Sequence, residues 1–202
     1  IYKNINNIWT KVGGEINGEY YGNSSGRSVS LSADGNVVAI SATGNADNGT
    51  DSGHVRIFKN VNNAWTQIGS DIDGDDIGDQ SGYSVSLSSD GSIVAIGARH
   101  NDGNGENSGH VRIYQDVNNT WIQVGIDIEG EAVYDNSGIS VSLSADGDVV
   151  AIGAPSNDGN GTDSGHVRVY QINFNKTAPN APSSLSTSSK SSDVTPTITG
   201  TA

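Results

Sequence analysis

Three loops rich in Asn, Asp and Gly carry the side chains best suited to bind a metal ion. They occupy residues 45–51, 101–107 and 157–163, and oxygen-bearing side chains alternate within them. Calcium prefers six to eight oxygen ligands, which such loops can supply. The same residue types also form loops because they tolerate left-handed backbone, and this simpler interpretation is the favoured one. The candidate calcium ligands are Asp47, Asn48, Asp51, Asp102, Asn104, Glu106, Asp158, Asn160 and Asp163.

The histidines do not form a catalytic pattern. His54, His110 and His166 recur at one position of a repeat, whereas catalysis needs one asymmetric cluster of residues. We therefore expect them to cap or pack a strand. His100 stands alone in a loop, and the sequence has no Gly-x-Ser-x-Gly nucleophile motif and no phosphate-binding loop. The sequence predicts no catalytic residue and no enzyme activity, and it does not identify ligand-binding residues.

A second acidic stretch, residues 71–79, has counterparts at 15–23 and 127–135. We interpret it as a solvated connector between repeats rather than a cation site. The formal net charge of −13 opposes approach to nucleic acid or to an anionic membrane. The absence of cysteine excludes disulfides and thiolate metal sites. No apolar run approaches the roughly 20 residues that a membrane-spanning helix needs.

The elements that would position these loops repeat every 56 residues. Trp9, Trp65 and Trp121 mark the period, and no insertion or deletion breaks it. Such regularity indicates one supersecondary unit copied in tandem. Residues 1–16 match the second half of a repeat, which leads us to expect that the natural chain extends upstream.

Each repeat has the pattern of four short strands. Alternation over residues 28–32 predicts a half-buried strand, and the apolar run 37–40 predicts a strand buried on both faces. An Asp-Gly pair joins them and predicts a tight turn with both residues at positive φ. The third and fourth strands are expected over 54–58 and 65–69, joined by an Asn-Asn turn.

Four antiparallel strands per repeat describe a blade of a β-propeller, an all-β fold. One such sheet cannot bury both faces alone and must stack on its neighbours. The repeated Trp offers apolar surface for that stacking and an N–H that needs a partner. We predict a partial propeller of about three blades, completed by neighbouring blades or by a second chain. The predicted units are a half blade over 1–16 and blades over about 25–72, 81–128 and 137–172.

Three motifs resemble the FG-GAP repeat of integrin α-subunits and of many bacterial surface proteins. They are Gly-x-Ser-Val-Ser, then Val-Ala-Ile-Gly-Ala-Pro at 150–155, then Gly-His-Val-Arg-Val-Tyr at 165–170. The likeness covers residues 1–172 and is closest to a bacterial subtype found in secreted, adhesin-like proteins. That family usually carries a D-x-D-x-D-G calcium loop between its first two strands. This chain has only a short Ser-Ala-Asp-Gly turn there, so the calcium sites of the family do not carry over.

Residues 173–202 differ in composition. They are rich in Pro, Ser and Thr, as linkers are, and the end at 195–202 resembles the opening strand of a bacterial Ig-like repeat. Together the resemblances imply a non-enzymatic, extracellular module of a large bacterial surface adhesin, serving structural display and cell adhesion. The alternative that stays open is a propeller that binds glycans or peptides with the help of calcium.

Overall fold

The regular structure consists of β-strands throughout the computed structural model, which describes residues 1–173. The predicted linker and Ig-like segment lie outside the described residues from position 174 onward. The first hairpin comprises β1 (Tyr2–Ile5) and β2 (Ile8–Lys11). The next repeat comprises β3 (Ser25–Leu31), β4 (Val37–Ala42), β5 (His54–Val61), β6 (Ala64–Gln67) and β7 (Ile72–Asp73). The following one comprises β8 (Ser84–Leu87), β9 (Ile93–Ala98), β10 (His110–Asp116), β11 (Trp121–Gln123) and β12 (Ile128–Glu129). The last comprises β13 (Ser140–Leu143), β14 (Val149–Ala154) and β15 (His166–Gln171).

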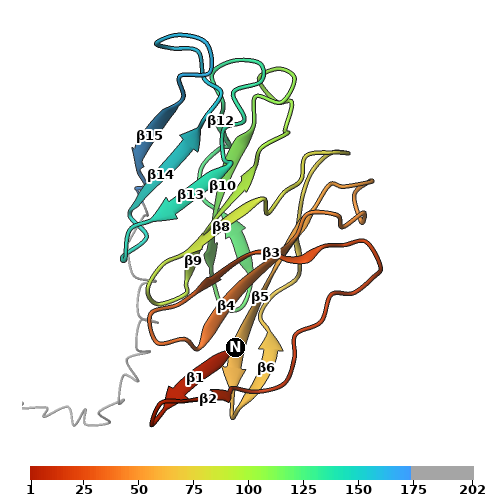
Figure 1. Cartoon of the computed structure of the whole chain (residues 1–202), viewed down its shortest axis with the longest axis vertical. Helices are drawn as coiled ribbons and strands as arrows, with labels where there is room; N and C mark the ends of the chain where they lie inside the picture. The colour runs from red at the N-terminus through yellow and green to blue at the C-terminus, as the bar shows by residue number, and fades with distance from the viewer. Residues whose placement is uncertain (174–202) are drawn as a thin grey trace, which may run out of the picture.

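Each repeat folds into one antiparallel sheet, and the sheets follow one another along the long axis of the molecule (Figure 1). The strand order is β3-β4-β5-β6 in what we call the first blade and β8-β9-β10-β11 in the second. The third blade has the order β13-β14-β15, and β1 and β2 form a separate hairpin. Consecutive strands are thus neighbours in space, as in propeller blades. The predicted all-β fold of partial propeller blades is confirmed.

The acidic connectors after the first and second blades contain short strands that the sequence pattern does not predict. Ile72 and Asp73 form β7, which pairs with the start of β5, while β6 pairs with its end. Ile72 is only 6 % exposed and belongs to the apolar core. The interpretation of this stretch as solvated is therefore wrong at Ile72, because its side chain is buried between two blades. In the second blade β12 pairs with β10 in the same way.

Two kinds of turn join the strands. Asn62 and Asn63 have φ values of 52° and 64°, the left-handed pair that a type I′ hairpin requires. The Asp-Gly turn differs from its prediction, because only Gly35 has positive φ, at 71°. The Asp34 carboxylate instead accepts a hydrogen bond from the N–H of Asn36 at 2.9 Å. A side-chain hydrogen bond, rather than two left-handed residues, closes this longer turn.

Apolar side chains of neighbouring blades pack into two cores. Strand β9, the second strand of the middle blade, contributes to both cores: Val94 and Ile96 pack toward the first blade, and Ile93 and Ala95 pack toward the third. This confirms the burial on both faces that the continuous apolar run predicts. The first core comprises Val37, Ala39, Val55, Ile57, Ile72, Val85, Leu87, Val94 and Ile96. The second comprises Ile93, Ala95, Val111, Ile113, Val150, Ile152 and Ile172.

Repeated polar contacts align the blades. The hydroxyl of Ser30 accepts a hydrogen bond from the N–H of Leu87 at 2.9 Å, and the hydroxyl of Ser86 accepts one from the next blade at 3.0 Å. The indole N–H groups of Trp65 and Trp121 donate to carbonyls of the preceding repeat at 2.9 and 3.0 Å. The serines that alternate with apolar residues thus satisfy backbone groups at the edge of the adjoining sheet.

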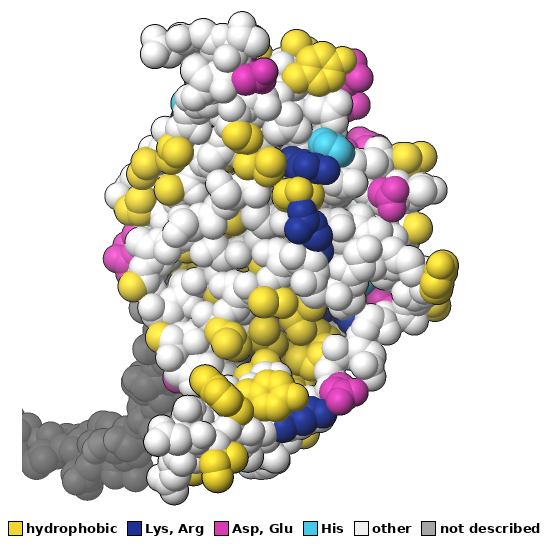
Figure 2. Space-filling view, in the orientation of Figure 1, with side chains coloured by type: hydrophobic (Ala, Val, Ile, Leu, Met, Phe, Trp, Pro, Cys, Tyr) yellow, Lys and Arg dark blue, Asp and Glu magenta, His cyan; other side chains and the backbone are white. Residues whose placement is uncertain are grey.

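The two outermost blades expose apolar side chains that the middle blade buries. Leu31 on β3 is 48 % exposed, whereas Leu87 at the same position of β8 is 7 % exposed. Val167 on β15 is 67 % exposed, whereas Val111 is fully buried. A groove of about 640 Å³ lies beside β3 and is lined in part by Val29. Figure 2 shows hydrophobic side chains gathered in the lower half of this view, where β1 to β4 lie. Each open face presents the kind of surface that an adjoining blade covers elsewhere.

Candidate functional site

The predicted calcium loops lie between the second and third strands of each blade. The Asp102 carboxylate accepts a hydrogen bond from the N–H of Asn107 at 2.7 Å, and Asp158 accepts one from the N–H of Asp163 at 2.8 Å. Asp51 and Asp163 have left-handed backbone, with φ of 55° and 51°. These residues close their own loops, which agrees with the loop-forming interpretation.

The remaining loop candidates also engage nearby backbone or side chains. Asn48 and Asn104 each donate to the carbonyl of a connector glycine 26 residues further on, at 2.9 and 2.8 Å. Glu106 accepts a hydrogen bond from a tyrosine hydroxyl, and the N–H of Asn160 donates to a serine hydroxyl of its own loop at 3.3 Å. Of the nine candidates, Asp47 alone joins a close group of acidic and histidine ligand atoms within residues 1–173. Calcium binding by these loops stays a prediction.

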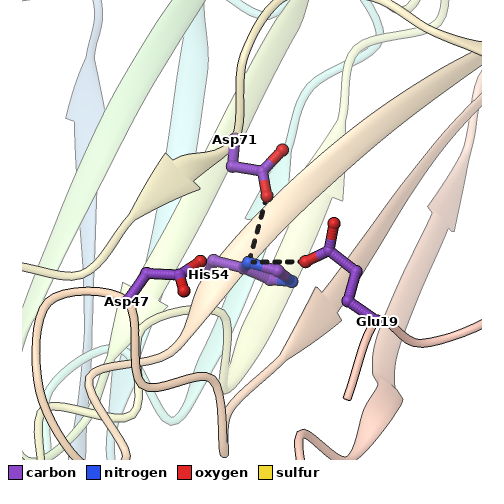
Figure 3. A group of neighbouring side chains, drawn as sticks. All are labelled: Glu19, Asp47, His54 and Asp71. Atoms are coloured by element: carbon purple, nitrogen blue, oxygen red, sulfur yellow. Dashed lines mark ion pairs between the residues drawn. The ribbon is translucent and has the colours of Figure 1, made fainter.

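The first blade brings four metal-ligand side chains together (Figure 3). His54 opens β5, Asp47 comes from the loop before it, and Asp71 directly precedes β7. Glu19 lies in the connector that leads into β3. One ligand atom of each residue lies within 4.8 Å of those of the others. The Nδ1 atom of His54 is 3.3 Å from Oδ2 of Asp71 and 4.0 Å from Oε2 of Glu19. We call these four residues the His54 group.

Donors outside the His54 group orient two of its carboxylates. Gln67 donates from Nε2 to Oδ1 of Asp71 at 2.6 Å. Arg56 places Nη1 3.2 Å from Oε1 of Glu19 and donates from Nη2 to a connector carbonyl at 2.8 Å. The second oxygen of each carboxylate therefore faces His54. The β-ladder and these donors hold His54, Asp71 and Glu19 close together, and Asp47 approaches them from its loop.

Negative charge accumulates around His54. Asp73, its partner in the ladder, has a raised pKa because it is buried and because Asp71 and other carboxylates lie nearby, although His54 opposes the shift. Nδ1 of His54 and Oδ1 of Asp73 are both buried without a hydrogen-bond partner among the described residues. Buried polar atoms cost free energy unless they are paired. Chemically, the arrangement can accept a proton or a cation.

The second blade holds a similar group, in which an arginine neutralises one carboxylate while Nδ1 of His110 is also buried without a hydrogen-bond partner among the described residues. His110, Asp127 and Glu129 form the corresponding group. Arg112 donates to Oδ2 of Asp127 from Nε at 2.9 Å and from Nη2 at 2.7 Å, and it also contacts Asp75. Burial raises the pKa of Asp127, but its hydrogen bonds, led by that of Arg112, outweigh burial and leave the pKa lowered. Burial lowers the pKa of His110 and raises the pKa of Glu129.

The third blade shows part of the pattern. Nδ1 of His166 is 3.6 Å from Oε2 of Glu131, and Nη1 of Arg168 is 3.5 Å from Oε1 of the same carboxylate. Arg168 also donates to a connector carbonyl at 2.5 Å, as Arg56 does. The residue that would match Asp71 lies outside the described residues.

Sequence patterns place these histidines in structural roles and so miss the group. A signal for it exists, because an acidic residue precedes each repeated histidine by 35 positions, as Glu19 precedes His54. Another acidic residue follows the first two histidines by 17 positions, as Asp71 follows His54. These residues come from separate segments of the repeat, and only the pairing of β5 with β7 shows that they converge.

Two stretches of the chain, residues 70–114 and 129–170, match the FG-GAP repeat family. They coincide with most of the second and third blades and include the strands that the motifs identify. The chain carries FG-GAP-like repeats. No curated protein sequence matches it significantly.

Solved structures similar to these FG-GAP-like repeats include hydrazine synthase of Kuenenia stuttgartiensis and a candidate 6-phosphogluconolactonase of Bacteroides uniformis. The first is 12 % identical with a TM-score of 0.45, covering 72 % of this chain and 33 % of that one. The second is 18 % identical with a TM-score of 0.42, covering 72 % of this chain and 40 % of that one. The chain thus spans less than half the length of either protein, and neither similarity supports an argument about function. Within residues 1–173 no helix is long and apolar enough to cross a membrane.

Proposed function

We propose that the chain is a non-enzymatic, extracellular repeat module of a large bacterial surface adhesin, serving structural display and cell adhesion. The observation that carries this proposal is the recurrence of the same contacts from blade to blade. Ser30 and Ser86 bind the next blade in the same way, as Trp65 and Trp121 bind the preceding one. Contacts that recur from blade to blade support a scaffold, because a catalytic centre needs a cluster that occurs once.

The exposed apolar faces support a role for the chain inside a longer stack. Leu31 and Val167 are exposed at positions where the middle blade is buried. Large exposed apolar patches mark surfaces that other protein covers. Neighbouring blades or a second chain would bury these faces, and the resulting rigid body suits the display of binding surfaces away from a cell.

The test combines location and adhesion. Antibodies against the folded chain should label intact bacteria that produce the protein, and trypsin applied to those cells should remove the label. Beads coated with the chain should adhere to the cells or matrix that the producing strain colonises, beyond beads coated with heat-unfolded chain. Label that appears only after lysis, or equal adhesion by both kinds of bead, would contradict the proposal.

A calcium-assisted glycan- or peptide-binding propeller is the second candidate. It is favoured by an acidic hollow of about 380 Å³ between connector and loop, whose lining includes Asp75, Asp79, Asp102 and Glu129. A glycan array and calorimetry, each with calcium and with chelator, separate the two functions. A ligand or a calcium-dependent melting shift supports binding, and their joint absence supports the structural module.

A further inference from the structure

The His54 imidazole is buried with one nitrogen unsatisfied. Its side chain is 1 % exposed, and Nδ1 points toward Asp71 and Glu19 (Figure 3). No described residue forms a hydrogen bond with this nitrogen, although Oδ2 of Asp71 is 3.3 Å away. A buried nitrogen held among carboxylates without hydrogen-bond geometry has the surroundings of a metal ligand.

The spacing of these atoms matches the size of a tetrahedral site. Zinc binds imidazole nitrogen and carboxylate oxygen at about 2.0–2.1 Å, so neighbouring ligand atoms of a tetrahedron lie about 3.3 Å apart. The His54 and Asp71 atoms already have that separation, and the Glu19 oxygen is 4.0 Å from His54. The exposed side chain of Asp47, whose Oδ2 accepts a hydrogen bond from Asn45 at 3.1 Å, supplies the fourth ligand atom within 4.8 Å of the others.

Charge around the His54 group favours a cation. Three carboxylates of the group lie together beside Asp73, and Arg56 pairs with one of them, Glu19, while also donating to a connector carbonyl. A proton on His54 supplies one positive charge and one donor, whereas a divalent ion neutralises two carboxylates and binds all four ligand atoms. A mixed imidazole and carboxylate donor set suits first-row divalent metals better than calcium, which prefers oxygen alone.

We propose that Glu19, Asp47, His54 and Asp71 bind one divalent transition-metal ion, with Zn²⁺ as the best match. The ion links the connector, the loop before β5, the start of β5 and the residue before β7. It therefore joins four segments of the first blade at one end of its sheet. This site is separate from the predicted calcium loops and shares only Asp47 with them.

The second blade provides an internal control. Gly103 occupies the position of Asp47, and a side chain there would begin 2.7 Å from a carboxylate oxygen of Glu129. Arg112 occupies Oδ2 of Asp127, the atom that matches the free oxygen of Asp71. One ligand is missing and another is already neutralised, so we expect no ion in the second blade.

Calorimetric titration of the chelator-treated full chain, carrying no polyhistidine tag, tests the proposal. We expect one equivalent of Zn²⁺ to bind per chain, and Co²⁺ to give the strong visible absorption of a four-coordinate ion. His54→Gln should raise the Kd for Zn²⁺ by more than about 100-fold, beyond the loss typical of residues that only support a ligand. Asp47→Gly copies the second blade in an exposed loop and should raise the Kd for Zn²⁺ by at least about 10-fold, with folding intact. His110→Gln should leave the affinity unchanged.

Three results would overturn the site. In the first, the intact chain binds Zn²⁺ no more tightly than the double variant His54→Gln/Asp47→Gly. In the second, His110→Gln loses as much Zn²⁺ affinity as His54→Gln. In the third, equimolar Ca²⁺ displaces the bound Zn²⁺. Circular dichroism of each variant separates a lost ligand from a lost fold. Because Asp47→Gly removes a loop side chain only, a normal spectrum with unchanged affinity would also count against the proposal.

Discussion

The first and second blades share a fold, but different donors pair with the carboxylates beside their histidines. Arg56 turns toward the connector and Glu19, whereas Arg112 turns toward Asp127. The residue that matches Glu19 in the second blade is Asp75, one methylene shorter, and Arg112 contacts it as well. Two repeats can therefore have the same strands and turns while a few differences among their acidic residues change which cation neutralises the carboxylates. The local charge network, rather than the fold, distinguishes the blades.

The largest expected difference in stability is between variants of Leu87 and Leu31, which occupy the same repeat position but differ in burial. Leu87→Ala removes a side chain from the core between two blades and should lower the free energy of unfolding by about 2–5 kcal/mol. Leu31→Ala changes the same repeat position on an open face, where the side chain is 48 % exposed, and should cost under about 1 kcal/mol. Urea unfolding of both variants measures the difference. Equal costs would mean that the open face of β3 is covered in solution.

Removal of Arg112, the arginine of the second blade, has the next largest expected effect on stability. Arg112→Met should lower the free energy of unfolding by about 1–2 kcal/mol, because Asp127 loses its donor while Asp75 remains half exposed and screened. Hydrogen bonding lowers the pKa of Asp127, so its contribution is present at neutral pH and is lost as pH falls through the folded-state pKa. Urea unfolding as a function of pH should therefore show less acid destabilisation in Arg112→Met. The control Arg56→Met leaves the hydrogen bonds of Asp127 intact; identical profiles for both variants would contradict the assignment.

The tryptophans offer a third matched pair. Trp121→Phe removes the hydrogen bond from Nε1 to the carbonyl of Ile68 and should cost about 1 kcal/mol. Trp9→Phe alters a side chain that is 69 % exposed on the opening hairpin and should change stability by only a few tenths of a kcal/mol, about the error of the measurement. Thermal unfolding followed by far-ultraviolet circular dichroism avoids the altered fluorescence. A larger loss in Trp9→Phe would indicate that the hairpin packs more tightly than its exposure suggests.

The strands were predictable from sequence because their signals are local. The alternation at 28–32, the apolar run at 37–40 and the Asn-Asn turn each specify structure within a few residues. Burial of Ile72 and the convergence of Glu19 and Asp71 on His54 were not predictable, since they depend on pairing between distant segments. The predicted geometry of the Asp-Gly turn is wrong because the carboxylate accepts hydrogen bonds within the turn and so competes with the two-residue hairpin.

The Asp-Gly turn gives the smallest expected effect on stability. It also tests whether the first and second blades form this turn with the same hydrogen bonds. Hydrogen bonds from the N–H of Asn36 and from the Ser32 hydroxyl lower the pKa of Asp34 to about 2 from its ordinary value of 3.8. The turn is therefore stabilised at neutral pH, and this contribution is lost as pH falls from about 4 toward 2. The pKa of Asp90 is lowered too, although burial opposes its hydrogen bonds. Carboxyl-detected NMR titration should show both aspartates ionising below their ordinary range, and Ser32→Ala should raise the pKa of Asp34 without moving that of Asp90. An Asp34 that titrates near 3.8 in the unaltered chain would show that its hydrogen bonds do not persist in solution.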